Sequence, residues 1–73
     1  MIFEEKIKEI IQNYNLGNFL KAENLVKRLL ARNSKDYQLC NIYGLILLKL
    51  HKTEGAISYF QRSIQIKSNF FEA

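Results

Sequence analysis

The sequence predicts an all-α fold of two helix-turn-helix repeats stacked as a short solenoid. Residues 3–36 can be laid over residues 37–70 at a shift of 34 residues. Apolar residues recur at spacings of three and four in four successive segments, which is the pattern of helices that bury one face. A fixed period of 20 to 50 residues is typical of solenoids, in which each unit buries its apolar face on its neighbour.

The repeat shows more in apolar character than in identity. Three pairs of residues are identical at this shift: Ala22 and Ala56, Arg28 and Arg62, Ser34 and Ser68. Four further pairs keep an apolar residue: Ile11 and Leu45, Leu16 and Leu50, Val26 and Phe60, Leu30 and Ile64. An aromatic residue recurs at the same spacing at Phe3, Tyr37 and Phe71. We therefore expect unit one at about 3–36, unit two at about 37–70 and the start of a third unit at 71–73.

The first unit predicts helices at about 3–15 and 18–32. Glu4 and Glu5 lie in the first turn, where carboxylates complement the helix dipole. Gly17 supplies the backbone freedom to end the first helix, and Asn18 is a good N-cap for the second. The second helix presents one apolar face, made of Phe19, Ala22, Leu25, Val26, Leu29 and Leu30. The basic cluster at its end, Lys27, Arg28 and Arg32, is interpreted as helix-end electrostatics, with a phosphate site as the alternative.

The second unit predicts helices at about 37–50 and 54–67. Ser34 or Asp36 is expected to cap the first of them, and Thr53 the second. The helix at 37–50 is apolar almost all round, which is typical of a helix packed on several sides. In the helix at 54–67, the side chains expected to face inward are Ala56, Ile57, Phe60, Ile64 and, as a further candidate, Tyr59.

Gly44 and Ala56 lie on the two helices of the second hairpin. Helix axes approach to about 8–10 Å only where the side chains at the crossing are small. Phe60 lies one turn beyond Ala56 and is expected to fill the space where the helices diverge.

These residues resemble the tetratricopeptide repeat (TPR) family, whose unit is about 34 residues of helix-turn-helix. In unit two, the family's glycine, alanine and aromatic are matched by Gly44, Ala56 and Phe60. Unit two differs from the family pattern at three positions, where Cys40, Tyr43 and Leu47 replace the family's tryptophan, leucine and tyrosine. In unit one, Ala22 and Val26 keep the pattern, Ile10 and Asn13 depart from it, and Gly17-Asn18-Phe19 resembles the family's turn. Ser34 and Ser68 stand at the closing proline.

The resemblance implies a right-handed solenoid whose first helices line a concave groove that binds a peptide or a partner domain. The implied partner-binding residues of unit two are Gln38, Asn41, Leu45, Leu48 and Lys49. Those of unit one are Glu4, Ile7, Ile11, Tyr14 and Asn15. Asn41 and Lys49 are expected to bind a peptide backbone or a terminal carboxylate, although Ile7 and Ile11 oppose a purely polar carboxylate clamp. The alternative for Leu45 and Leu48 is packing on neighbouring helices.

Composition excludes several classes of protein. The chain has 73 residues, 48% of them hydrophobic, one cysteine and a net charge of +4. This length suits one small domain, and a single cysteine excludes an internal disulfide. No apolar run approaches the ~20 residues of a membrane span, and the N-terminus lacks a cleavable signal pattern, so we expect a cytoplasmic protein without a membrane partner. The basic residues are dispersed, which argues against nucleic acid.

No pattern of catalytic, cofactor-binding or metal-binding residues is found, so no enzyme activity is expected within these residues. His51 has no Cys, Asp or second His at ligand spacing, and it is expected to lie exposed in a turn. Cys40 lies among apolar residues and is expected to be a buried structural thiol.

The predicted function is that of a protein-interaction module. The main alternative is the N-terminal, substrate-recruiting arm of a larger glycosyltransferase- or sulfotransferase-type enzyme, of which this chain is a fragment. An assembly scaffold is a third hypothesis and nucleic-acid binding a fourth. Because repeat arrays need about three units for stability, the chain is expected either to continue into further repeats or to self-associate through the exposed C-terminal edge of unit two.

Overall fold

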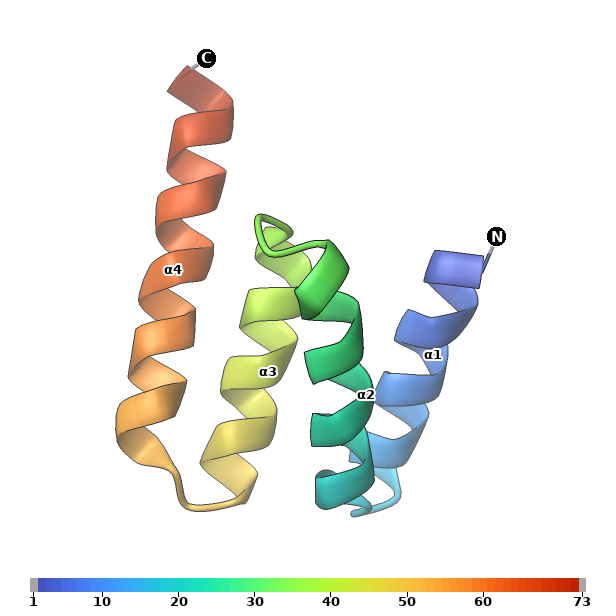
Figure 1. Cartoon of the computed structure of the whole chain (residues 1–73). Helices are drawn as coiled ribbons and strands as arrows, with labels where there is room; N and C mark the ends of the chain where they lie inside the picture. The colour runs from blue at the N-terminus through green and yellow to red at the C-terminus, as the bar shows by residue number, and fades with distance from the viewer. Residues whose placement is uncertain (1, 73) are drawn as a thin grey trace.

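The computed structural model describes the backbone of residues 2–72 and the side chains of residues 3–68. Over this range the chain forms four helices and no strand: α1 (Ile2–Asn15), α2 (Phe19–Arg32), α3 (Tyr37–Lys49) and α4 (Thr53–Glu72). The predicted all-α class is thus confirmed. Consecutive helices run in opposite directions (Figure 1).

The packing follows the order of the chain. The extensive helix contacts are α1 with α2, α2 with α3, and α3 with α4, and the last of these is the most extensive. The molecule measures 37 × 32 × 18 Å and is therefore flat. The middle helices have a neighbour on each side, whereas α1 and α4 each have one flank without a neighbour in the described part of the chain (Figure 1).

The boundaries of α1, α2 and α3 agree with the sequence-based expectation to about one residue. The expected end of the fourth helix near residue 67 is wrong, because α4 continues to Glu72 without a break at Ser68. Neither glycine nor proline occurs there, and a serine alone is a weak stop signal. Residues 71 and 72 thus belong to α4, and Ala73 lies outside the described residues.

The two hairpin turns share one backbone geometry at the 34-residue shift. Gly17 and His51 both adopt positive φ, 84° and 62°. The next amide donates to a carbonyl five residues back in each turn, Asn18 to Asn13 and Lys52 to Leu47, both at 2.8 Å. These bonds satisfy carbonyls that a helix end would leave unpaired. The sequence repeat is therefore also a repeat of local structure at the turns.

The helix caps are only partly as expected. The Asp36 side chain accepts a hydrogen bond of 3.0 Å from the Leu39 amide and caps α3. Asn18 occupies the N-cap position of α2, but its side chain makes no capping hydrogen bond. The side-chain amide nitrogen of Asn18 donates instead to Asn13 Oδ1 at 3.3 Å. Thr53 is the first residue of α4 and not its cap.

The core lies between the helices, with α3 contributing the largest share. The following residues are buried: Ile7, Ile10, Ala22, Val26, Leu29, Leu30, Leu39, Cys40, Tyr43, Ile46, Leu47 and Ala56. On α4, the expected inward positions of Ile57 and Ile64 are wrong, since these side chains are 50% and 69% exposed. Among the helices that the structure describes, only α3 packs extensively against α4, so the described residues of α4 are buried on one flank.

Gly44 lets α3 and α4 meet. A Cβ atom at this position would lie 2.5 Å from Cε1 of Phe60, so only glycine leaves room for the ring. Ala56 is fully buried in the same core. The expected close approach and the expected position of Phe60 are both confirmed. Within the described part of the chain, no helix combines the length and hydropathy that crossing a bilayer requires.

Candidate functional site

The predicted partner-binding residues of unit two lie along one side of α3. Gln38, Asn41, Leu45, Leu48 and Lys49 are all exposed, and we call this set the α3 stripe. Their spacing of three, four and seven residues places them on one face of the helix. The opposite side of α3 is buried through Leu39, Cys40, Tyr43, Ile46 and Leu47. Leu45 and Leu48 are 40% and 44% exposed, so each is only partly covered by its neighbours within the described part of the chain.

A pocket of about 260 Å³ adjoins one end of the stripe, between α3 and α4. Its lining residues are Tyr37, Gln38, Asn41, Ser63, Ile64 and Lys67. The Ser63 hydroxyl donates a 2.8 Å hydrogen bond to the Tyr37 carbonyl and fixes the two helices at the base of this pocket. The Lys67 ammonium lies 5.8 Å from the centre of the Tyr37 ring. The pocket thus combines amide groups, one cation and the exposed side chain of Ile64.

The predicted residues of unit one behave differently. Glu4 and Asn15 are exposed, and Ile11 is 43% exposed. Tyr14 is half-buried, with its ring edge-on to Phe19 at 5.6 Å. Ile7 belongs to the core, so its predicted contact with a partner is wrong.

The structure does not join the two halves of the predicted groove by direct packing. α1 and α3 are not among the helix pairs in extensive contact; α2 packs against both of them. The α3 stripe and its adjoining pocket are therefore the best-defined part of the predicted surface.

α2 also contains a buried carboxylate, Glu23, which the sequence pattern did not lead us to expect. Glu23 is 5% exposed and accepts a hydrogen bond from the Tyr43 hydroxyl at 3.0 Å. Lys52 and Lys27 approach the same oxygen at 3.5 and 3.9 Å. The spacing of apolar residues could have predicted this burial. Glu23 follows Phe19 by four residues and precedes Val26 by three, so it lies on the flank of the apolar face of α2.

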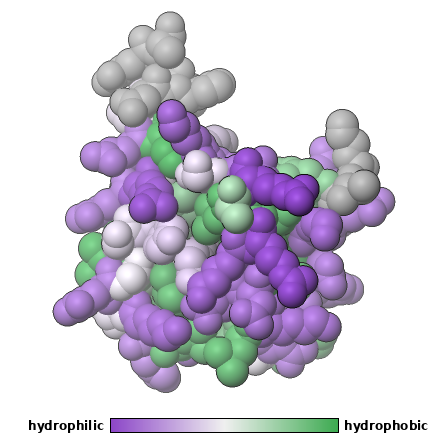
Figure 2. Space-filling model, viewed as in Figure 1, coloured by the Kyte–Doolittle hydropathy of each residue, from purple (hydrophilic) through white to green (hydrophobic). Residues whose placement is uncertain are grey.

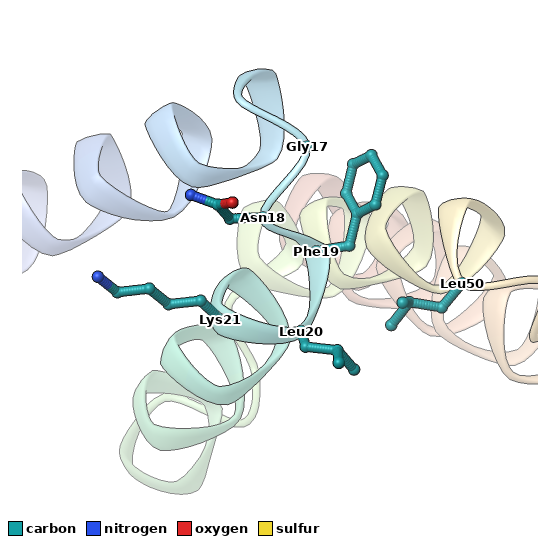
Figure 3. A pocket seen from close by; sticks show the side chains of 6 residues that line it. All are labelled: Gly17, Asn18, Phe19, Leu20, Lys21 and Leu50. Atoms are coloured by element: carbon teal, nitrogen blue, oxygen red, sulfur yellow. The ribbon is translucent and has the colours of Figure 1, made fainter.

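A more open hollow lies elsewhere, between the first turn and the end of α3. Its volume is about 540 Å³, and Leu20 and Leu50 point toward each other across it (Figure 3). Lys21 points away from it (Figure 3). None of the predicted partner-binding residues is among its lining residues. The hollow is shallow and open, so a ligand would make few contacts in it.

The chemically reactive side chains are dispersed. Cys40 is fully buried, as expected, and burial raises the pKa of its thiol. His51 is exposed in its turn, also as expected. Among residues whose positions the structure describes, no group of three or more His, Cys, Asp or Glu side chains is arranged to hold a metal ion.

Comparison with known proteins gives no match: no family model, no curated protein and no solved structure is significantly similar to the chain. The resemblance to the TPR family therefore depends on the residues and the repeated turn geometry described above.

Proposed function

We propose that the chain is a TPR-like protein-interaction module that binds a peptide or a partner domain along the α3 stripe. The observation that carries the proposal is the exposure of Leu45 and Leu48, at 40% and 44%, on a helix whose other sides are packed. Polar side chains of Asn41 and Lys49 lie beside them on the same face. A small apolar centre with a polar rim is the usual composition of a protein interface.

The position of the stripe favours recognition over chemistry. α3 is held by α2 on one side and by α4 on the other, so its exposed side chains start from a rigid backbone. The visible face in Figure 2 is mostly hydrophilic, with hydrophobic residues in small separate patches. An amide such as Asn41 offers both a donor and an acceptor, which suits a peptide backbone.

Three features support the assignment to stacked repeats of the TPR kind. The sequence repeats at 34 residues, and both hairpin turns use the same backbone bonds at that shift. Gly44 and Phe60 stand at the family's glycine and aromatic positions and are packed against each other. In such a stack, the first helix of each unit would line the binding surface.

Selection of peptides from a phage-displayed library against the immobilised 73-residue chain tests the proposal. The affinity of a selected peptide is then measured by fluorescence anisotropy for the chain and for a Leu45→Ser/Leu48→Ser variant. We expect at least about tenfold weaker binding by the variant, because the apolar centre of an interface carries most of its free energy.

Leu16→Ser/Leu20→Ser provides the matched control, since these two leucines are 73% and 67% exposed and lie outside the stripe. The control should bind within about twofold of the unmodified chain. Equal losses in the two variants, or no enriched peptide at all, would contradict the proposal. Circular dichroism shows whether each variant keeps its helical content.

A further inference from the structure

A second pocket lies between α1 and α2, away from the α3 stripe. It has a volume of about 430 Å³ and is lined by Lys6, Leu25, Arg28, Leu29, Ala31 and Arg32. This volume falls within the range of about 300–1,000 Å³ that ligand pockets occupy in proteins. None of the residues in the proposed partner-binding stripe contributes to it.

Three cations line this pocket, and no carboxylate is among its described lining residues. Within the range whose side chains are described, Lys6, Arg28 and Arg32 form no ion pair, whereas the neighbouring Lys27 approaches Glu23 at 3.9 Å. Arg28 and Arg32 are one turn apart on α2, so their guanidinium groups arise from the same side of that helix. Three like charges at one hollow repel one another, and an anionic ligand would relieve that repulsion.

The floor of the pocket is apolar. Leu29 is buried and Leu25 half-buried, so apolar surface lies beneath the cationic rim. A ligand that fits must therefore place an apolar group inward and negative charges outward. A peptide with one aliphatic side chain between carboxylates has this chemistry, and Arg binds carboxylates through paired hydrogen bonds.

We propose that this pocket is a second binding site, which takes an acidic peptide segment with one aliphatic side chain between its carboxylates. The proposal does not depend on the function of the α3 stripe. A partner protein that contacts both surfaces would pass from α3 around α2 to α1.

Comparison of the two units favours a dedicated site in unit one. At the 34-residue shift the three cations correspond to Cys40, Arg62 and Ile66, so unit two has one cation where unit one has three. Arg62 already has an internal partner, because its guanidinium carbon lies 4.8 Å from the centre of the Tyr59 ring. Leu25 stands at the position equivalent to Tyr59 and leaves Arg28 without such a ring.

An acidic membrane surface fits the pocket less well than a peptide. A protein that lies on a bilayer inserts protruding apolar side chains among the lipids, with basic residues at the headgroups. Here the apolar side chains of Leu25 and Leu29 form the floor of a hollow. A side chain must enter the pocket to reach them, as a peptide side chain does.

The test uses a fluorescein-labelled peptide of sequence Asp-Glu-Leu-Asp-Glu and fluorescence anisotropy with the full chain at low salt. We expect saturable binding that weakens as salt is added. An Arg28→Gln/Arg32→Gln variant should bind at least about tenfold more weakly, because two charge-assisted contacts are removed. A Lys8→Gln/Lys21→Gln variant loses the same charge from exposed positions outside the pocket and should stay within about twofold.

Two further peptides separate charge from shape. Asn-Gln-Leu-Asn-Gln tests the carboxylates and Asp-Glu-Ser-Asp-Glu tests the aliphatic side chain, and both should bind more weakly than the parent peptide. Equal losses in the two protein variants would overturn the proposal, as would equal binding of the leucine and serine peptides. A third outcome would also overturn the proposal: the chain binds none of the peptides but sediments with phosphatidylserine vesicles, and the Arg28→Gln/Arg32→Gln variant does not sediment. That result would assign the pocket to membranes instead. The Leu45→Ser/Leu48→Ser variant should bind the acidic peptide as the unmodified chain does. Failure of the α3 proposal can therefore be distinguished from failure of this one.

Discussion

The Tyr43 hydroxyl donates a 3.0 Å hydrogen bond to Oε2 of Glu23, and this buried contact joins α3 to α2. Lys52, from the turn between α3 and α4, approaches the same oxygen at 3.5 Å. The carboxylate of the first hairpin is thereby bound to two separate parts of the second. A buried charge is tolerated when it is paired and hydrogen-bonded, as Glu23 is here.

Tyr43→Phe should destabilise the fold. The substitution removes the hydroxyl donor and leaves the nearly buried carboxylate of Glu23 with a lost partner. A hydrogen bond to a charged group contributes about 1.5–3 kcal/mol, so we expect a loss of this order in the free energy of unfolding, measured with urea. Tyr37→Phe is the control, since the Tyr37 side chain is 44% exposed and Ser63 bonds only to its backbone carbonyl. Equal urea midpoints for the two variants would contradict this account of the contact.

Stability should fall as the pH rises above about 8.5. Burial is the main factor that raises the pKa of Tyr43, with further contributions from the Glu23 hydrogen bond and charge. Burial likewise raises the pKa of Cys40. In the unfolded chain these groups ionise near about 8.5 for Cys and 10 for Tyr. Above those values the unfolded state binds fewer protons than the folded state, so stability decreases with rising pH.

Urea unfolding of the chain between pH 7 and pH 10 measures this effect. In a Cys40→Ala/Tyr43→Phe variant neither group titrates, so its stability should decline less steeply over the same interval. A parallel decline in both proteins would show that other groups cause the effect. Below about pH 7 both side chains keep their protons in either state and contribute almost no slope.

The periodicity of apolar residues predicted most of the fold, because helices that pack on one another need apolar residues at that spacing. The spacing of apolar residues located α1, α2 and α3, and the small residues Gly44 and Ala56 indicated where α3 and α4 approach. The exposed positions of α3 were also predicted, through the resemblance to the TPR family. These features depend on local pattern, which a sequence displays directly.

The features that sequence did not predict depend on which neighbours are present. Ile57 and Ile64 have the spacing of core residues, yet no described helix covers their flank of α4. Ile7 was assigned to a binding surface although its side chain is buried. The pocket on α1 and α2 brings Lys6 beside Arg28 and Arg32 from a distant part of the chain, which no local pattern shows.

Gly44→Ala should destabilise the α3–α4 pair. The added Cβ would lie 2.5 Å from the Phe60 ring, so the ring or the helix must shift. Overpacking of this kind costs about 1–3 kcal/mol, which corresponds to a fall of several degrees in Tm by circular dichroism. Gly55→Ala is the control, because its Cβ would meet only the flexible end of Leu47, at 3.3 Å. If Gly55→Ala proves equally destabilising, the close approach at Gly44 is not the cause.

His51→Gly should stabilise the chain. His51 has a φ of 62°, which is unfavourable for a residue with a Cβ, and the equivalent position in the first turn is Gly17. Relief of this strain, less the extra entropy of glycine in the unfolded chain, should be worth roughly 0.5–1 kcal/mol. The Tm should rise by a few degrees, whereas His51→Ala, which keeps the Cβ, should leave Tm nearly unchanged. A lower Tm for His51→Gly would mean that the imidazole itself contributes to stability.

The exposed flank of α4 should make the thermal stability depend on concentration. Ile57 and Ile64 are seven residues apart, hence about two turns along one side of the helix, and both are at least half exposed. A second copy that covers this flank would bind only the folded state and raise Tm by mass action. We expect Tm to increase across a roughly hundredfold range of protein concentration, and light scattering to show association at the upper end. Ile64→Gln should abolish this dependence, whereas Leu20→Gln should retain it, because Leu20 is similarly exposed, at 67%, but lies on α2. A Tm that is the same at all concentrations, with a monomer by light scattering, would contradict self-association through α4.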